Sequence, residues 1–260
     1  ERLAFYLNRI GWDIDDWFTY WLENDRYLIG SKFRVKETKI DWIWGICLPL
    51  LTEIKNHLDS RNERAVFGLS GLPGSGKTSI GNWLNHACLE LNLPVKVISL
   101  DDFYLSGDDL DNKMLGNPWK VPRGIPGSHS IDVLLKTLDD FHTKGDALYP
   151  QFDKSLRNGL GDRSGWRRSY PTILIIEGWF LGCKSLGYDL DEYILSEEEN
   201  QLYLADDEIS YREIIQNNLQ LYHPVWDQIK IKWHIKAEKI GYTAIWKSQQ
   251  EHNMLQKKGA

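Results

Sequence analysis

Residues 71–78 read Gly-Leu-Pro-Gly-Ser-Gly-Lys-Thr and match the pattern GxxxxGK(S/T) at every specified position. Glycines in such a loop let backbone N–H groups curl around phosphate oxygens, because no side chain stands in the way. The N-terminus of the following helix adds positive partial charge. A lysine in this place reaches the β- and γ-phosphates, and the hydroxyl after it binds Mg²⁺. The stretch predicts a nucleotide-phosphate site made of Gly71, Gly74, Ser75, Gly76, Lys77 and Thr78.

Carboxylates follow two strand-like segments further along the chain. Asp101 and Asp102 come directly after residues 94–100, and Glu177 ends the apolar run 172–176. The carboxyl ends of parallel strands border one ligand crevice, so these groups can reach the same phosphate. Phosphoryl transfer needs an acidic group near Mg²⁺ and a group that orients the acceptor hydroxyl. We expect Asp101 to be the base and Glu177 to belong to the magnesium shell.

Asp102 is open to two interpretations. Adjacent residues at a strand end point apart, so only one of the aspartates at 101 and 102 is expected to face the phosphate. Asp102 then either contacts the substrate or accepts a hydrogen bond that holds its loop.

A cluster of basic residues lies in two long polar segments, 105–128 and 145–171, which we expect to be loops. Loops of this length inside a compact domain are usually functional, and arginine is suited to planar bidentate capture of carboxylate or phosphate. We expect Arg123 and Lys154 near the acceptor and Arg163 near either anion. Solvated surface charge is the alternative for all of these residues, and it is the favoured interpretation for Arg157, Arg167 and Arg168.

Tyr104 and His129 are two further candidates for contact with a substrate. Tyr104 could donate a hydrogen bond to it or simply pack. His129 could bind the substrate or Asp101, and a histidine held by loop backbone is an equally good interpretation. The spacing of His and Cys residues indicates no zinc site, and no Ser-His-Asp order can be argued.

Several of these segments resemble a known group of kinases. The phosphate loop, Asp-Asp-Phe-Tyr at 101–104 and Ile-Glu-Gly at 176–178 resemble the phosphoribulokinase, uridine kinase and pantothenate kinase superfamily. Residues 117–129, NPWKVPRGIPGSH, resemble the RGxPGTH segment of the D-glycerate 3-kinase family. Residues 149–163, YPQFDKSLRNGLGDR, resemble its YDKS…NGxGDR segment. The resemblance covers residues 65–255, and these two segments are far more specific to the family than the phosphate loop.

The resemblance implies phosphorylation of the 3-hydroxyl of D-glycerate by ATP with Mg²⁺, giving 3-phosphoglycerate and ADP, a reaction of photorespiration. It places the base at Asp101 and the acidic metal position at Glu177. The chain departs from the family pattern at Ser130, where Asp is common, and at Lys247, where Arg is expected. Members of the family also commonly continue for some tens of residues beyond the point where this sequence stops.

Two other functions stay open at this point. One is a kinase for another small hydroxylated metabolite, such as a nucleoside, pantothenate or a sugar. The other is an ATP-binding regulator without transfer activity, which the departures from the pattern allow. The presence of Lys77, Thr78, Asp101 and Glu177 argues against a regulator, because these are the residues that phosphoryl transfer requires.

Composition limits the remaining choices. The formal net charge of −6, from 31 basic and 37 acidic residues, disfavours a protein built to grip a nucleic-acid backbone. No apolar run reaches the roughly 18 residues of a membrane-spanning helix. Three cysteines without CxxC spacing, Cys47, Cys88 and Cys183, are expected to be reduced and packed in the core. These features favour the cytoplasm, or the plastid stroma if a transit peptide has been removed, and leave the oligomeric state unknown.

The elements that position the candidate residues form a βαβ pattern. We expect strands at 65–70, 94–100 and 172–176, and helices at 77–91, 130–142 and through 207–258. The alternation of strand and helix predicts an α/β fold: a three-layer P-loop NTPase-type domain with a mostly parallel sheet, at residues 63–260.

The first 62 residues are expected to form a helical layer packed on that domain. Five of the twelve tryptophans lie in the first 44 residues, and apolar side chains between positions 10 and 22 share one helical face. A second helix is expected at 38–58. Aromatic packing between helices is the favoured interpretation of this region, and an aromatic cage for a ligand is the alternative.

Overall fold

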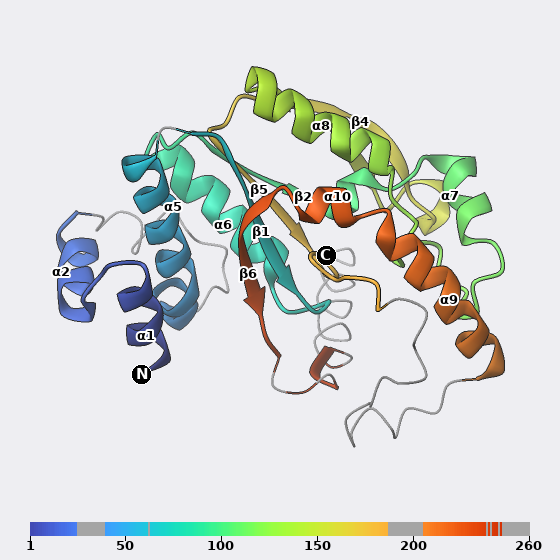
Figure 1. The fold of residues 1–260 in the computed structure, drawn as a ribbon, viewed down its shortest axis with the longest axis horizontal. Coiled ribbons are helices and arrows are strands. Elements are labelled where there is room, and N and C mark those ends of the chain that lie inside the picture. The colour runs from blue at the N-terminus through green and yellow to red at the C-terminus, as the bar shows by residue number, and fades with distance from the viewer. Residues whose placement is uncertain are drawn as a thin grey trace, which may run out of the picture.

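The computed structural model describes residues 1–24, 40–61, 63–186, 205–237, 239, 241–243 and 245. In this part of the chain a sheet of four parallel strands has the order β2-β5-β1-β6 (Figure 1). The strands span Ala65–Gly71 (β1), Val95–Ser99 (β2), Ile173–Gly178 (β5) and Ile229–Ile235 (β6). Every residue of β1 and β5 is buried, as expected for central strands covered on both faces.

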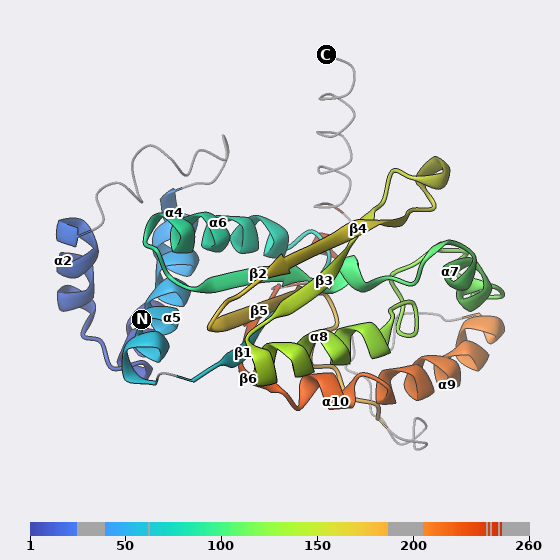
Figure 2. The same cartoon turned by 90° about the horizontal axis from the view of Figure 1, so that it is seen from above.

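Helices cover both faces of the sheet, which gives three layers (Figure 2). On one face, β1 side chains such as Phe67 share a core with α5 (Leu48–Ser60) and α6 (Lys77–Glu90). On the other face, alternate residues such as Val66 share a second core with α8 (Ile131–Lys144), α9 (Asp206–Gln220) and α10 (His223–Trp226). The predicted α/β fold with a mostly parallel sheet is confirmed.

The N-terminal segment forms the helices α1 (Arg2–Arg9), α2 (Ile14–Asn24) and α4 (Ile40–Trp42). A π-helical turn, η1 (Ile43–Cys47), joins α4 to α5. Trp17 and Trp21 are fully buried, and both indole N–H groups donate to Thr52 Oγ1 on α5, at 2.7 and 3.0 Å. These two tryptophans therefore pack helix against helix, as the favoured interpretation of this region stated.

Two segments expected as loops contain regular structure. Residues 105–128 include α7 (Gly107–Met114), which has acidic residues in its first turn and Lys113 in its last, an arrangement that suits the helix dipole. Residues 145–171 form an antiparallel hairpin of β3 (Ala147–Asp153) and β4 (Asp162–Ser169). The polar composition of these segments was misleading, because α7 and the hairpin each bury only one side.

The expectation of continuous helix over 207–258 is wrong at residues 229–235, which form β6. Apolar side chains alternate there at Ile229, Ile231, Trp233 and Ile235, a spacing of two residues that is typical of a strand. Cys47 and Cys88 are buried as expected, whereas Cys183 is exposed at the end of the turn after β5. Lys247 and its neighbours lie outside the described residues.

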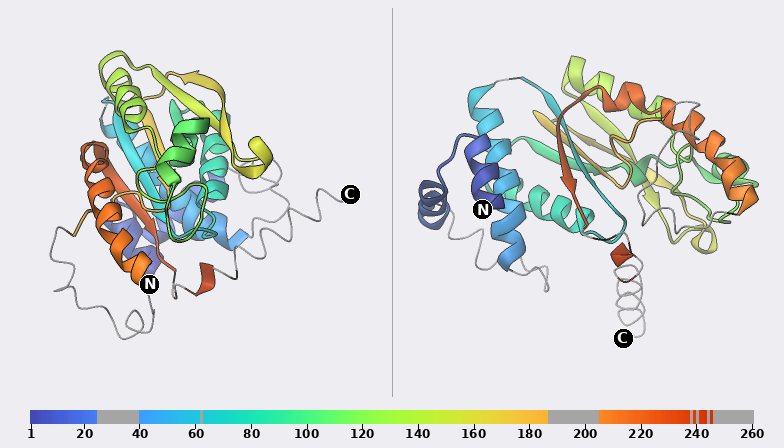
Figure 3. Two further views of the ribbon diagram at one scale, coloured as in Figure 1. Left: turned by 90° about the vertical axis from the view of Figure 1, so that its right-hand side faces the viewer. Right: turned by 60° about the horizontal axis from the view of Figure 1, so that its bottom comes forward.

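No helix in the described ranges is both long and apolar enough to cross a membrane. Figure 3 shows that the hairpin and α7 lie at one end of the molecule, away from α1 and α2. The loop between β1 and α6 lies at the carboxyl end of β1, between these two ends of the molecule.

Candidate active site

The loop of residues 71–76 joins β1 to α6 in the conformation that its glycines allow. Gly74 and Gly76 have φ values of +81° and +86°, which L-residues rarely adopt. Gly71 leaves no room for a side chain, because a Cβ there would lie 2.8 Å from Ser75 Oγ. The Gly71, Gly74, Ser75 and Gly76 positions therefore form a narrow backbone loop at the N-terminus of α6, as a phosphate cradle requires.

Lys77 and Thr78 begin α6 directly after this loop. The Lys77 ammonium is buried and donates to the Leu72 carbonyl oxygen at 2.9 Å, so the side chain bends back over the loop. Burial lowers the pKa of Lys77, and the nearby carboxylates of Glu177 and Asp101 oppose that shift. A phosphate anion in the loop would replace the carbonyl as the partner of a charged ammonium.

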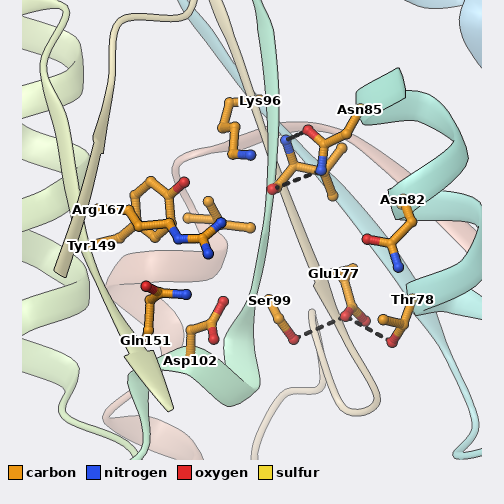
Figure 4. A pocket seen from close by; sticks show the side chains of 13 residues that line it. Thr78, Asn82, Asn85, Lys96, Ser99, Asp102, Tyr149, Gln151, Arg167 and Glu177 are labelled. Atoms are coloured by element: carbon orange, nitrogen blue, oxygen red, sulfur yellow. Dashed lines mark hydrogen bonds between the residues drawn. The ribbon is translucent and has the colours of Figure 1, made fainter. Parts of the chain in front are cut away.

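Glu177 lies beside Thr78 at the end of β5. Its Oε1 atom accepts hydrogen bonds from Thr78 Oγ1 at 3.0 Å and from Ser99 Oγ at 2.9 Å (Figure 4). Burial raises the pKa of Glu177, and the two hydroxyl donors counteract part of the rise. Ser99 was missed in the sequence, although it is the last residue of β2 and pairs in register with Glu177.

The Thr78 hydroxyl and the Glu177 carboxylate fit a magnesium site. Both are hard oxygen ligands, and Mg²⁺ is usually held by one or two protein groups, several waters and substrate phosphates. Among the described residues no group of three or more His, Cys, Asp or Glu side chains gathers into a metal cage. The donor set therefore suits an ion that arrives with nucleotide phosphates rather than a dedicated structural metal.

Asp101 lies in the 3-10 turn η2 (Leu100–Phe103), directly after β2. Its Oδ2 atom accepts from Lys154 Nζ at 2.6 Å, and its Oδ1 atom accepts from the Tyr104 hydroxyl at 2.9 Å. Burial of Asp101 favours the neutral acid, but the charge and hydrogen bond of Lys154 outweigh it and lower the pKa. The structure thus holds Asp101 as a carboxylate next to one cation and one hydroxyl.

The His129 ring packs against the ring of Tyr104. The two rings stack with centroids 4.4 Å apart, and the two residues form an isolated antiparallel bridge. His129 is buried, and its Nδ1 atom lies 2.8 Å from the Tyr222 hydroxyl. Burial lowers the pKa of His129 to about 4, so the ring is neutral near pH 7. These contacts place His129 behind Tyr104 rather than beside the phosphate loop.

The structure brings Lys154 to Asp101, but Arg123 and Arg163 bind backbone oxygens instead. Arg123 Nη1 donates to the carbonyls of Gly159 and Leu160, at 2.9 and 2.8 Å. Arg163 Nη2 donates to the Tyr104 carbonyl at 3.1 Å. Arg123 therefore ties the hairpin tip to the segment that precedes His129, and Arg163 ties the start of β4 to the residue after η2.

Asp102 lies in the same 3-10 turn as Asp101 but has a different hydrogen-bond partner. Its Oδ1 atom accepts weakly from the Phe152 N–H at 3.4 Å, and burial raises its pKa. Asp102 lines a cavity of about 310 Å³ at the open edge of β2, between α6 and the β3–β4 hairpin (Figure 4). The same cavity reaches Thr78, Ser99 and Glu177.

Comparison with known proteins places this architecture in a family. No family model matches the chain. An uncharacterised kinase of Schizosaccharomyces pombe, mug58, is 32% identical over 198 residues, covering 72% of this chain and 70% of that protein. The chloroplastic D-glycerate 3-kinase of Arabidopsis thaliana is 26% identical over 279 residues, covering 98% of this chain. This chain spans 58% of the length of the plant enzyme.

A solved structure shows the same fold. The D-glycerate 3-kinase from Cryptococcus neoformans superposes with a TM-score of 0.70 at 29% identity, covering 84% of this chain and 81% of that one. The phosphate loop and the strand-end carboxylates are features of a P-loop kinase, and these relatives are named as kinases. The chain belongs to the D-glycerate 3-kinase family of P-loop kinases.

Proposed function

We propose that the protein transfers the γ-phosphoryl group of ATP to the 3-hydroxyl of D-glycerate, giving 3-phosphoglycerate and ADP. The observation that carries the proposal is the convergence of three groups at the carboxyl ends of the strands: the cradle with Lys77, the Thr78–Glu177 pair, and Asp101 held by Lys154. The named activity of the plant and Cryptococcus relatives supports D-glycerate as the acceptor.

In this reaction the backbone of residues 71–78 and the Lys77 ammonium bind the phosphates of ATP. Thr78 and Glu177 would hold Mg²⁺, which neutralises charge on the transferring phosphates when it is bound. Asp101 accepts the proton of the acceptor hydroxyl as that oxygen bonds to the γ-phosphorus. The bond between the γ-phosphorus and the bridging oxygen breaks, and ADP leaves with the electron pair.

The surroundings of Asp101 suit a base that is ionised before the substrate arrives. Lys154 and Tyr104 stabilise its negative charge, which keeps it unprotonated at neutral pH. A carboxylate of low pKa is a weak base and hardly deprotonates a hydroxyl in the ground state. The main role of Asp101 is therefore to orient the hydroxyl while the transfer proceeds. Tyr104 and, behind it, His129 hold Asp101 in that position.

The test is an ADP-release assay with Mg-ATP and D-glycerate, L-glycerate, uridine, pantothenate or no acceptor. We expect release that depends on D-glycerate and falls by about 10²- to 10⁴-fold in Asp101→Asn. The matched control is Asp109→Asn, which removes an exposed carboxylate on α7 and should leave the rate unchanged.

Each other outcome of the assay contradicts part of the proposal. Release with uridine or pantothenate in place of D-glycerate would show that the acceptor is wrong. ATP binding without acceptor-dependent release would favour a non-catalytic ATP-binding regulator. An active Asp101→Asn variant would show that another group orients the hydroxyl.

A further inference from the structure

Two cations from different strands face one cavity. Lys96 on β2 and Arg167 on β4 both line the space at the open edge of β2. Figure 4 shows their side chains on the side of the cavity opposite Thr78 and Asn82. Sequence reasoning treated Arg167 as surface charge and passed over Lys96, because the two positions are far apart in the chain.

Neither cation is paired within the part of the chain that the structure describes, since no ion pair or side-chain hydrogen bond involves Lys96 or Arg167. The other basic residues of the hairpin are engaged. Arg157 pairs with Asp111, and Arg168 lies 3.3 Å from Asp146. Lys154 pairs with Asp101, and Arg163 binds backbone. Arg167 is therefore the arginine of this hairpin whose charge is left for a ligand.

The two cations repel each other in the absence of an anion. Burial, and then the neighbouring Arg167 guanidinium, lower the pKa of the Lys96 ammonium. Asp102 lines the same cavity; burial raises its pKa, whereas the charge of Arg167 lowers it, so one carboxyl group faces two cations. A bound carboxylate would relieve this repulsion, and a planar guanidinium binds a carboxylate with two parallel hydrogen bonds.

The cavity also joins this cationic end to the phosphate-transfer site. Thr78, Ser99 and Glu177 line its other side, so a molecule bound at Arg167 would lie in the same cavity as these three residues. Its volume of about 310 Å³ lies at the low end of the range for small-molecule sites, so the cavity can hold a compact acceptor. Polar groups of Gln151 and Asp102 line the wall between the two ends.

We propose that Arg167 and Lys96 bind the carboxylate of the acceptor and so select a hydroxy acid over an uncharged polyol. This inference rests on the proposed kinase function and adds the residues that determine its substrate class. The Asp102 carboxylate accepts hydrogen bonds from the hydroxyl groups of the same molecule, and the Gln151 amide donates to them or accepts from them. Lys154 then serves mainly to hold Asp101.

The test compares Arg167→Gln with Arg168→Gln, its neighbour on β4, whose charge is paired with Asp146. We expect Arg167→Gln to raise the KM for D-glycerate by about 10- to 100-fold, with the KM for ATP unchanged, because a charge-assisted contact is lost. The preference of the enzyme for D-glycerate over glycerol, which lacks the carboxylate, should shrink by the same factor. Lys96→Gln should act in the same direction, and Arg168→Gln should behave as wild type.

Calorimetric binding of D-glycerate in the presence of a non-hydrolysable ATP analogue gives a second readout that does not need turnover. Equal D-glycerate affinity in Arg167→Gln and Arg168→Gln would overturn the inference and leave the proposed function standing. A raised KM for ATP would also overturn it, since the cations would then serve the nucleotide. If wild type neither binds nor turns over D-glycerate, the proposed function fails. A panel of other small hydroxy acids then tests the cavity, and the absence of Arg167-dependent binding for all of them would overturn the inference as well.

Discussion

Protonation of His129 should cost the protein a measurable part of its stability in mild acid. The ring is buried, stacks on Tyr104 and shares a hydrogen bond with Tyr222, and burial lowers its pKa from 6.5 to about 4. Between these two values the unfolded chain binds a proton that the folded chain does not bind. The free energy of unfolding must therefore fall as the pH drops through this window.

The magnitude follows from the width of the window. Each pKa unit corresponds to about 1.4 kcal/mol, so the contribution of His129 amounts to about 2 kcal/mol lost by pH 5 and about 3 kcal/mol by pH 4. Below pH 4 both states carry the proton, and this contribution levels out. Other groups also titrate in acid, so the effect of His129 is isolated by comparison with a variant that cannot titrate.

The assay is urea denaturation of wild type and His129→Asn at a series of pH values between about 4 and 7, followed by two spectroscopic probes. The asparagine amide can still reach Tyr222, so the variant loses ring packing but keeps a polar partner. We expect the variant to be less stable at neutral pH, and the gap to narrow by about 3 kcal/mol toward pH 4. A gap that stays constant over this range would refute the reasoning, because it would show that the folded protein accommodates a charged His129 without cost.

Three further predictions concern the site and the core. Lys154→Met should move the acid limb of the pH profile of kcat/KM to higher pH by about half to one unit, because Asp101 loses its neighbouring cation. An acid limb at the wild-type pH would show that it does not report the ionisation of Asp101. Glu177→Gln should lower kcat by about 100-fold or more and raise the Mg²⁺ concentration needed for activity, measured by Mg²⁺ titration; an unchanged requirement would remove Glu177 from the magnesium shell. Thr52→Val should cost about 2–4 kcal/mol in denaturant unfolding, because two buried indole N–H groups lose their acceptor; a loss below about 0.5 kcal/mol would show that the indoles find other partners.

The parts of the site that the sequence predicted best are contiguous in the chain. Residues 71–78 form the loop that their spacing indicates, because glycine positions dictate local backbone geometry without help from distant segments. The positions of Asp101 and Glu177 follow from a general rule, since both come at the carboxyl ends of parallel strands. The central strands were also predicted from the sequence, because short runs rich in β-branched residues and flanked by glycine or proline are typical of buried parallel strands.

Secondary structure with one solvated side was harder to read. The β3–β4 hairpin and α7 carry so many polar residues that they resembled loops, and their few apolar side chains become informative only once a surface is there to cover them. The strand β6 was hidden for another reason. Its alternation of apolar and charged residues was present in the sequence, but a helical pattern on its N-terminal side obscured it.

The sequence by itself determined that this chain folds around a phosphate loop, with carboxylates at the strand ends, and which family it resembles. All of that depends on local spacing and on the hydrophobic pattern. Only the tertiary structure decided how the basic residues are divided between tasks. Arg123 and Arg163 donate hydrogen bonds to backbone carbonyls, whereas Arg167 faces a cavity with Lys96 from another strand. The charge of an arginine is set by its own chemistry, but whether that charge is available to a ligand depends on which acceptors the fold brings within hydrogen-bonding distance.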